Sequence, residues 1–224
     1  MASAYVQNNG NGTSTSLSGF PAGANGNTFV IFHSSFRSAG ARTISSVACT
    51  NVTWTNLGVL SSGGLTVEIW AGRISGGSSG TTITLTMSGT GATLITDIHE
   101  FSGLTSPTTT DGTFATNSGT GTSLTTSAWS ASFADDLKLN VAGWADGNAP
   151  STTPSGWSSG TFRNSGTSNS VLASWKVGTQ TTGSESAPMS IPGSVAWKTI
   201  IGGLRTPSTS VASGSRLTLL GLGS

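Results

Sequence analysis

The seven residues Thr82-Ile83-Thr84-Leu85-Thr86-Met87-Ser88 alternate strictly between hydroxyl-bearing and apolar side chains. Successive side chains of a β-strand point to opposite faces of a sheet, so this pattern predicts a strand with one face on a core and the other in water. The same period of two runs through residues 65–71 and 171–177. Glycine-rich turns separate these stretches, and no window combines helical spacing with helix caps. The sequence therefore predicts an all-β protein.

The composition agrees with a β-rich domain and argues against several classes of partner. Only 8% of the 224 residues are charged and the net charge is +1, against roughly a quarter charged in an average soluble domain. The nine basic residues are scattered without a run, so we expect no nucleic-acid partner. Seven Trp and eight Phe argue against disorder.

The termini and the cysteine count bear on where the chain is made. The first ten residues lack the basic start and apolar run of a signal peptide, and no apolar stretch is long enough to span a membrane. We expect a chain that is made in a host cytoplasm and has no membrane partner. The single cysteine, Cys49, cannot form an internal disulfide and is interpreted as a small core residue.

The order of motifs in the first hundred residues recurs in the second half, at an offset of roughly 105 residues. Each half contains a Gly-Thr-Ser segment, an apolar strand, a strand with Trp and Gly, a short alternating strand and a closing strand. The matched stretches are 12–17 with 121–124, 29–32 with 137–141, 68–72 with 173–178, 85–89 with 189–193, and 94–101 with 195–204.

Two architectures fit two similar halves without helices. One is a single two-sheet antiparallel β-sandwich, jelly-roll-like, in which each half contributes strands to both sheets. The other is two small sandwiches joined near residues 106–126. We favour the single sandwich because the core of each half alone would be marginal. The predicted organisation is an extended arm at 1–19, a sandwich at 20–207 with repeats at about 20–104 and 129–207, and a tail at 208–224.

Catalysis has one candidate, the stretch Asp97-Ile-His99-Glu100. On a strand, Asp97 and His99 share a face with their Cα atoms about 6–7 Å apart, and such a pair can orient a base for a serine nucleophile. No Gly-x-Ser-x-Gly elbow accompanies it. We therefore favour a hydrogen-bonded polar cluster and predict no catalytic residue. We expect His99→Ala to abolish no activity and to leave the fold largely intact.

Metal-binding patterns are equally sparse. His33, His99 and Cys49 form no zinc set of recognised spacing. The pair Asp135-Asp136 and the stretch Asp146-Gly147-Asn148 offer oxygen ligands for calcium but are typical of turns. We predict no metal and no cofactor.

The tryptophans are the remaining candidates for binding. Trp175 lies on an apolar strand face and is interpreted as core, as are Trp54 and Trp157. Trp70 shares a face with Thr66 and Glu68, which we interpret as the wetter side. Trp70 then serves as a sugar-stacking platform or is buried at a subunit interface, and the interface is favoured because aromatic side chains anchor such contacts.

Five motifs follow one another in an order typical of a known group of proteins. They are Tyr5-Val-Gln7, Thr53-Trp-Thr55, Glu68-Ile-Trp70, Thr82-Ile-Thr-Leu-Thr86 and Glu100-Phe-Ser-Gly-Leu104. Over residues 4–206 the chain resembles jelly-roll virion proteins of tailed bacteriophages, which include capsid decoration (cement) proteins, often trimeric, and tail-fibre modules. The resemblance implies a structural role in the virion and no catalytic residues.

We therefore expect a non-enzymatic decoration protein on the capsid surface, with the major capsid protein and copies of itself, as a trimer, for partners. The candidate interface residues are Tyr5, Val6, Trp70, Leu217, Leu219, Leu220 and Leu222. The arm at 1–19 and the tail are expected to pair with neighbouring chains, and deleting residues 208–224 to weaken assembly. The alternatives are a carbohydrate-binding tail-fibre or adhesin module, with a glycan as partner, and, last, a cell-wall glycan hydrolase that uses Asp97 or Glu100.

Overall fold

The computed structural model describes residues 2–106, 109–178 and 180–207. Every regular element within these ranges is a β-strand, which confirms the predicted all-β class. The described residues contain no helix long and apolar enough to cross a membrane. The leucines of the predicted tail, at positions 217, 219, 220 and 222, lie outside the described residues.

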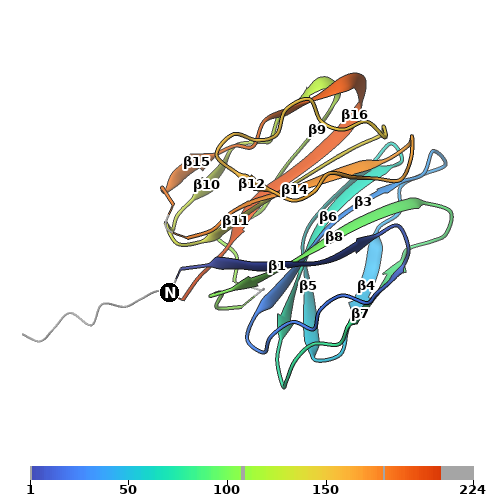
Figure 1. Cartoon of the computed structure of the whole chain (residues 1–224). Coiled ribbons are helices and arrows are strands. Elements are labelled where there is room, and N and C mark those ends of the chain that lie inside the picture. The colour runs from blue at the N-terminus through green and yellow to red at the C-terminus, as the bar shows by residue number, and fades with distance from the viewer. Residues whose placement is uncertain (1, 107–108, 179, 208–224) are drawn as a thin grey trace, which may run out of the picture.

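Two large antiparallel sheets pack face to face (Figure 1). The first has the order β1 (Ala4–Gly12), β8 (Thr93–Ser102), β3 (Thr28–Phe36), β6 (Leu65–Ile74), β5 (Val52–Ser62). The second has the order β12 (Ser158–Ser159), β14 (Ser170–Lys176), β11 (Leu137–Trp144), β16 (Met189–Leu204), β9 (Ala115–Leu124), and β13 (Arg163–Asn164) also pairs with β14.

A shared core fills the space between the large sheets. It contains buried apolar side chains of both, among them Phe32 and Ile69 from the first and Val141 and Trp175 from the second. Burying such side chains contributes about 1.5–3 kcal/mol each, before ordering costs. One continuous core across both halves confirms the predicted β-sandwich.

Each large sheet carries a small sheet on its outer face. The strands β2 (Ser16–Ser18), β7 (Thr82–Met87) and β4 (Ile44–Ala48) cover the first, and β10 (Trp129–Ala131) and β15 (Gly183–Glu185) cover the second. On β7, Ile83 and Leu85 are buried in a core that also contains Phe29 and Ile31 of β3, whereas the threonines face water. The alternation of residues 82–88 was therefore interpreted correctly.

The two halves follow the same path through the fold. In each half, the first strand lies beside the last, as β1 does beside β8 and β9 beside β16. The last strand also lies beside a central strand, which is β3 in the first half and β11 in the second. The second strand pairs with the second to last, β2 with β7 and β10 with β15. This equivalence extends the repeat to residues 4–102 and 115–204. The stretch 106–126, where two separate sandwiches would have been joined, contains β9 of the second large sheet.

Two expectations about chain assignment are wrong. The halves do not interleave: the first builds one large sheet with its small sheet, and the second builds the other pair (Figure 1). Strands close in sequence tend to lie beside one another in space, so each half forms its own sheets. The arm at 1–19 is not held out for a neighbouring chain, because β1 pairs with β8 and β2 with β7 of the same chain.

Candidate functional site

A groove opens at the edge of the sandwich where β1 of the first sheet faces β14 and the segment 159–163 of the second. We call it the inter-sheet groove; its volume is about 450 Å³ and it is lined by Tyr5, Asn8, His99, Ser159, Gly160, Thr161, Arg163 and Trp175. Aromatic, cationic, amide and hydroxyl side chains from both halves of the chain converge there. Pockets that mix apolar walls with a few polar groups are the usual place for ligand binding.

A β-bulge in β1 aims two of these side chains into the groove. Tyr5 pairs with Phe101 and Gln7 pairs with Glu100. Val6 has no partner of its own on β8 and is therefore the extra residue of the bulge. Because strand side chains alternate, Tyr5 and Asn8 would otherwise point to opposite faces. Asn8 instead lies across from His99, on the groove side.

Tyr5 forms an aromatic platform at the rim of the groove. Its ring stacks on that of Trp175, with centroids 5.1 Å apart and planes inclined by 17°. Tyr5 is 39% exposed and Trp175 only 5%. Trp175 therefore supports one face of the Tyr5 ring, and the rest of the Tyr5 ring reaches water. The ring of His99 also lies against Trp175, at 4.5 Å between centroids.

Asp97 and His99 form a buried pair behind this platform. His99 Nε2 lies 2.8 Å from Asp97 Oδ2, and Asn8 Nδ2 donates to Asp97 Oδ1 at 3.0 Å. Gly160 closes over the pair: a Cβ on it would lie 2.8 Å from Asp97 Oδ2, so only glycine permits this approach. The hydrogen-bonded polar cluster predicted for this stretch is confirmed.

The pair lacks the geometry of a catalytic triad. His99 Nδ1 is buried and has no hydrogen-bond partner among the described residues, so no serine lies in position to be activated. Glu100 points to the other face of β8, where its carboxylate accepts hydrogen bonds from Gln7 Nε2 at 2.7 Å and Asn27 Nδ2 at 2.6 Å. It therefore braces the turn before β3, away from Asp97.

Burial of His99 changes the expected result of His99→Ala. The substitution removes the contact with Trp175 and leaves the buried Asp97 carboxylate with one fewer donor. We now expect it to lower the free energy of unfolding by about 2–4 kcal/mol, measured by urea denaturation. Asn8→Ala, which removes the hydrogen bond to Asp97 and the one that Asn8 Oδ1 accepts from the backbone N–H of Gly10, should cost only about 1–2 kcal/mol. A loss below that of Asn8→Ala would show that the pair is not structural.

Trp70 lies elsewhere, and the role predicted for it is wrong. It is only 9% exposed and belongs to the core between the first large sheet and its small outer sheet. Its Nε1 donates to Glu68 Oε2 at 2.9 Å. The face that it shares with Glu68 is covered by β2, β7 and β4 of the same chain, so Trp70 needs no partner subunit to bury it and offers no surface to a sugar.

The other predicted interface residues within the described part of the chain are exposed, and the predicted core residues are wholly or partly buried. Tyr5 and Val6 are exposed, at 39% and 43%, but only Tyr5 lies in the groove. Trp157 is buried in the outer core of the second half and Trp54 is partly buried in that of the first, as expected for core residues. Cys49 is also partly buried there, and burial raises the pKa of its thiol.

The two acidic stretches considered for calcium, at 135–136 and 146–148, bond and titrate within the chain itself. Asp146 Oδ1 accepts a hydrogen bond from the backbone N–H of Asn148 at 2.7 Å. Burial, followed by the charge of Asp111, raises the pKa of Asp136 to about 6. Within residues 2–106, 109–178 and 180–207, no three His, Cys, Asp or Glu side chains gather in a way that would hold a metal ion.

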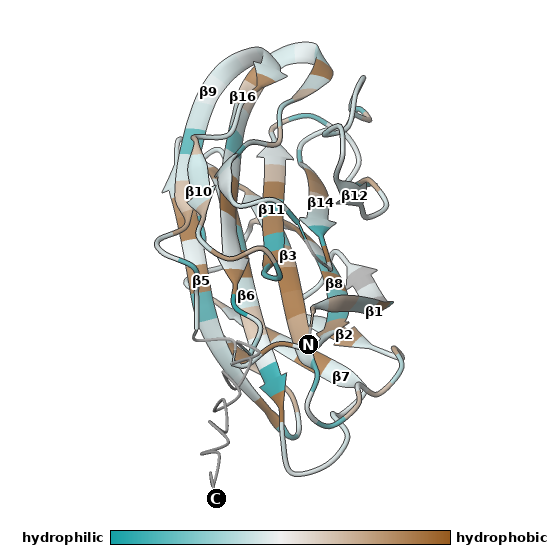
Figure 2. Ribbon diagram, turned by 90° about the vertical axis from the view of Figure 1, so that its left-hand side faces the viewer, coloured by the Kyte–Doolittle hydropathy of each residue, from teal (hydrophilic) through white to brown (hydrophobic). Residues whose placement is uncertain are grey.

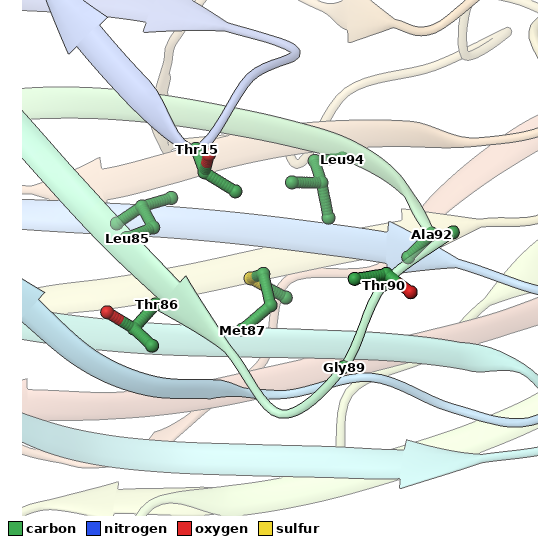
Figure 3. Close-up of a pocket in the computed structure, with 9 residues that line it drawn as sticks. Thr15, Leu85, Thr86, Met87, Gly89, Thr90, Ala92 and Leu94 are labelled. Carbon is green, nitrogen blue, oxygen red and sulfur yellow. The ribbon is translucent and has the colours of Figure 1, made fainter.

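A second hollow, of about 470 Å³, lies between β7 and the loop that leads into β8. Figure 3 shows Leu85, Met87 and Leu94 around it, with Thr15, Thr86 and Thr90 at its rim. No charged or titratable side chain lines it. This hollow is the open end of the core between the first large sheet and its small outer sheet. Polar, charged and aromatic side chains come together in the inter-sheet groove instead.

Comparison of the chain with protein-family models, with curated proteins and with solved structures yields no match.

Proposed function

We propose that this chain is a non-enzymatic virion structural protein that decorates the outside of an assembled capsid. The observation that carries the proposal is a pair of long, uncharged edge strands. β5 and β9 end their sheets, and neither contains a charged residue or a proline. They lie on the same side of the sandwich (Figure 2), where Gly58 of β5 approaches Ile200 of β16, the neighbour of β9.

Edge strands expose backbone N–H and C=O groups that can pair with another chain. Soluble proteins commonly protect such edges with charges, prolines or bulges. β5 and β9 contain neither charged residues nor prolines, and the apolar side chain of Val59 on β5 is 46% exposed. Two such edges on the same side of the sandwich favour attachment through main-chain pairing. With so few charges on the chain, this attachment should depend little on salt.

The strand connections support the same proposal. Along the first half, β1, β3, β5, β6 and β8 belong to the large sheet and β2, β4 and β7 to the small one, so the chain changes layer at every step except between β5 and β6. This alternation between two layers resembles a jelly roll, the fold implied by the resemblance to phage virion proteins. The major capsid protein and further copies of this chain, arranged as a trimer, are the partners that we propose.

Lysines introduced on β9 test the proposal. Thr120 and Thr122 are exposed, so Thr120→Lys/Thr122→Lys should leave the fold unchanged and weaken binding to heads at least about tenfold, because charged edges resist pairing. The heads are those of the phage that encodes the chain, stripped of it, and binding is measured by co-sedimentation. Thr82→Lys/Thr84→Lys, on the central strand of an outer sheet, is the matched control and should bind normally. Equal binding by both variants would exclude the β9 edge as the attachment site.

Carbohydrate binding is a second candidate function, and the inter-sheet groove favours it. A supported aromatic ring beside amide, hydroxyl and guanidinium groups suits a sugar, which has both an apolar face and hydroxyls. We do not propose the hydrolase. Glycosidases use two carboxyl groups that flank one bond, whereas Asp97 and Glu100 lie on opposite faces of β8.

A further inference from the structure

Arg163 is the least satisfied charged group of the inter-sheet groove. Its backbone is fixed by the pairing of β13 with β14. Its guanidinium has no hydrogen bond or ion pair among the described residues, and its Nε is buried without a partner. A partly buried guanidinium without a partner is costly, and its planar fork of donors fits a carboxylate in bidentate fashion.

Asp97, a buried carboxylate bonded to two residues that line the groove, is already engaged. Both oxygens of Asp97 are bonded, one to His99 and one to Asn8. Arg163 is therefore free to receive a carboxylate from outside. A single arginine near a buried aspartate does not favour a polyanion such as nucleic acid, which requires several cations along its path.

The remaining lining suits a ring with hydroxyl groups. Tyr5, supported by Trp175, offers an aromatic face near the rim, and Ser159 and Thr161 supply hydroxyls. Burial and the charge of Asp97 raise the pKa of Tyr5, so its hydroxyl remains a neutral donor and acceptor at pH 7.

The internal repeat provides a comparison inside the same molecule. β9 takes the place of β1 in the second half, and β16 that of β8. On β16 the shared-core side carries Ile200 and Gly202, and Phe114 packs against Gly202. That side of the sandwich is filled with apolar side chains. Packing of the two sheets therefore does not in itself require an acid, a histidine and an arginine at the edge.

We propose, on the basis of the second candidate function, that the inter-sheet groove binds a carboxylate-bearing sugar of a surface glycan. Arg163 pairs with the carboxylate, and Tyr5 stacks against the ring. Asn8, Ser159 and Thr161 contact the hydroxyls. Asp97 and His99 position Asn8 and Trp175 and do not contact the ligand.

The experiment compares matched acidic and neutral sugars. The full chain is titrated calorimetrically with oligosaccharides that contain a uronic or sialic acid and with the same oligosaccharides after reduction of the carboxyl group to an alcohol. We expect the acidic member to bind about tenfold more tightly or better. Arg163→Gln should abolish that difference, Arg163→Lys should restore it in part, and Tyr5→Ala should weaken both members about tenfold.

Arg37→Gln is the control, because it removes the same charge at a residue that does not line the groove and should leave binding unchanged. Circular dichroism establishes that each variant is folded. Equal binding of acidic and neutral sugars, unaffected by Arg163→Gln, would overturn the carboxylate assignment and leave glycan binding standing. No binding of any sugar would overturn both. Tighter binding of an acidic peptide than of any sugar would assign the groove to a protein partner instead.

Discussion

Replacing Glu185 with alanine should destabilise the protein by about 3–5 kcal/mol, the usual cost of leaving a buried charge without its partner. Lys138 on β11 is completely buried beneath the small outer sheet of the second half. Its ammonium donates to Glu185 and to the carbonyl oxygen of Thr181, the latter at 2.6 Å. Without Glu185 a buried cation has only a carbonyl for a partner.

The surrounding groups provide the controls for Glu185→Ala. Lys176 donates to the other carboxylate oxygen at 2.8 Å, and its ammonium lies 4.9 Å from the centre of the Trp157 ring. Lys176→Ala leaves Glu185 paired with Lys138 and should cost about 1–2 kcal/mol. The double variant Lys138→Met/Glu185→Leu should recover most of the stability, because it removes both charges together. Urea denaturation at pH 7 gives the three values. A cost for Glu185→Ala no larger than that for Lys176→Ala would show that the ion pair adds little.

Acid should destabilise the protein through His33, by about 3 kcal/mol between pH 6.5 and pH 4 at about 1.4 kcal/mol per pH unit. His33 is fully buried in the outer core of the first half. Its Nδ1 lies 2.9 Å from Thr96 Oγ1, and its Nε2 has no partner among the described residues. Burial lowers its pKa to about 3. The unfolded chain takes up a proton below about pH 6.5 and the folded chain does not, so this stability is complete above pH 6.5 and is lost towards pH 3.

Glu68, which pairs with His33 across the strands, changes stability in the opposite direction. Burial raises its pKa to about 7, although hydrogen bonds from the Trp70 side chain and the Ile44 backbone act to lower the pKa. Its contribution is therefore present at low pH and is lost as the pH rises towards 7. The profile of the parent chain sums both effects, so the difference between parent and variant is the quantity to measure.

The variant His33→Asn isolates the histidine. Free energies of unfolding at pH 7, 5.5 and 4 should show the variant gaining about 3 kcal/mol on the parent chain as the pH falls. Glu68→Gln should behave in the opposite way, gaining on the parent as the pH rises from 4.5 to 7. Parallel profiles for His33→Asn and the parent chain would mean that His33 is protonated in the folded state.

The period of two was enough to predict which residues share a strand face, but it does not indicate what covers that face. It placed Trp70 with Glu68 correctly, and the face was interpreted as wet because Thr66 and Glu68 are polar. The buried Ile83 and Leu85 of β7 needed an apolar surface to pack on, and that requirement was the available signal that the Trp70 face is covered.

The inter-sheet groove was only partly predictable for the same reason. The Asp97 and His99 spacing indicated a polar pair on one face, and Tyr5 and Trp175 were each recognised as notable. Their meeting depends on how two sheets pack and on a bulge at Val6, and neither is encoded in local periodicity. Arg163 was missed because a single arginine in a short strand carries no pattern.

The proposed function requires that a phage encodes the chain, and cryo-electron microscopy of purified heads of that phage, freed of tails, tests it most directly. We expect the four-layered sandwich at regular, symmetric positions on the outer surface of the shell, in contact with its neighbours through β5 and β9. Heads that lack the chain, or a chain found only on the tail or its fibres, would contradict capsid decoration.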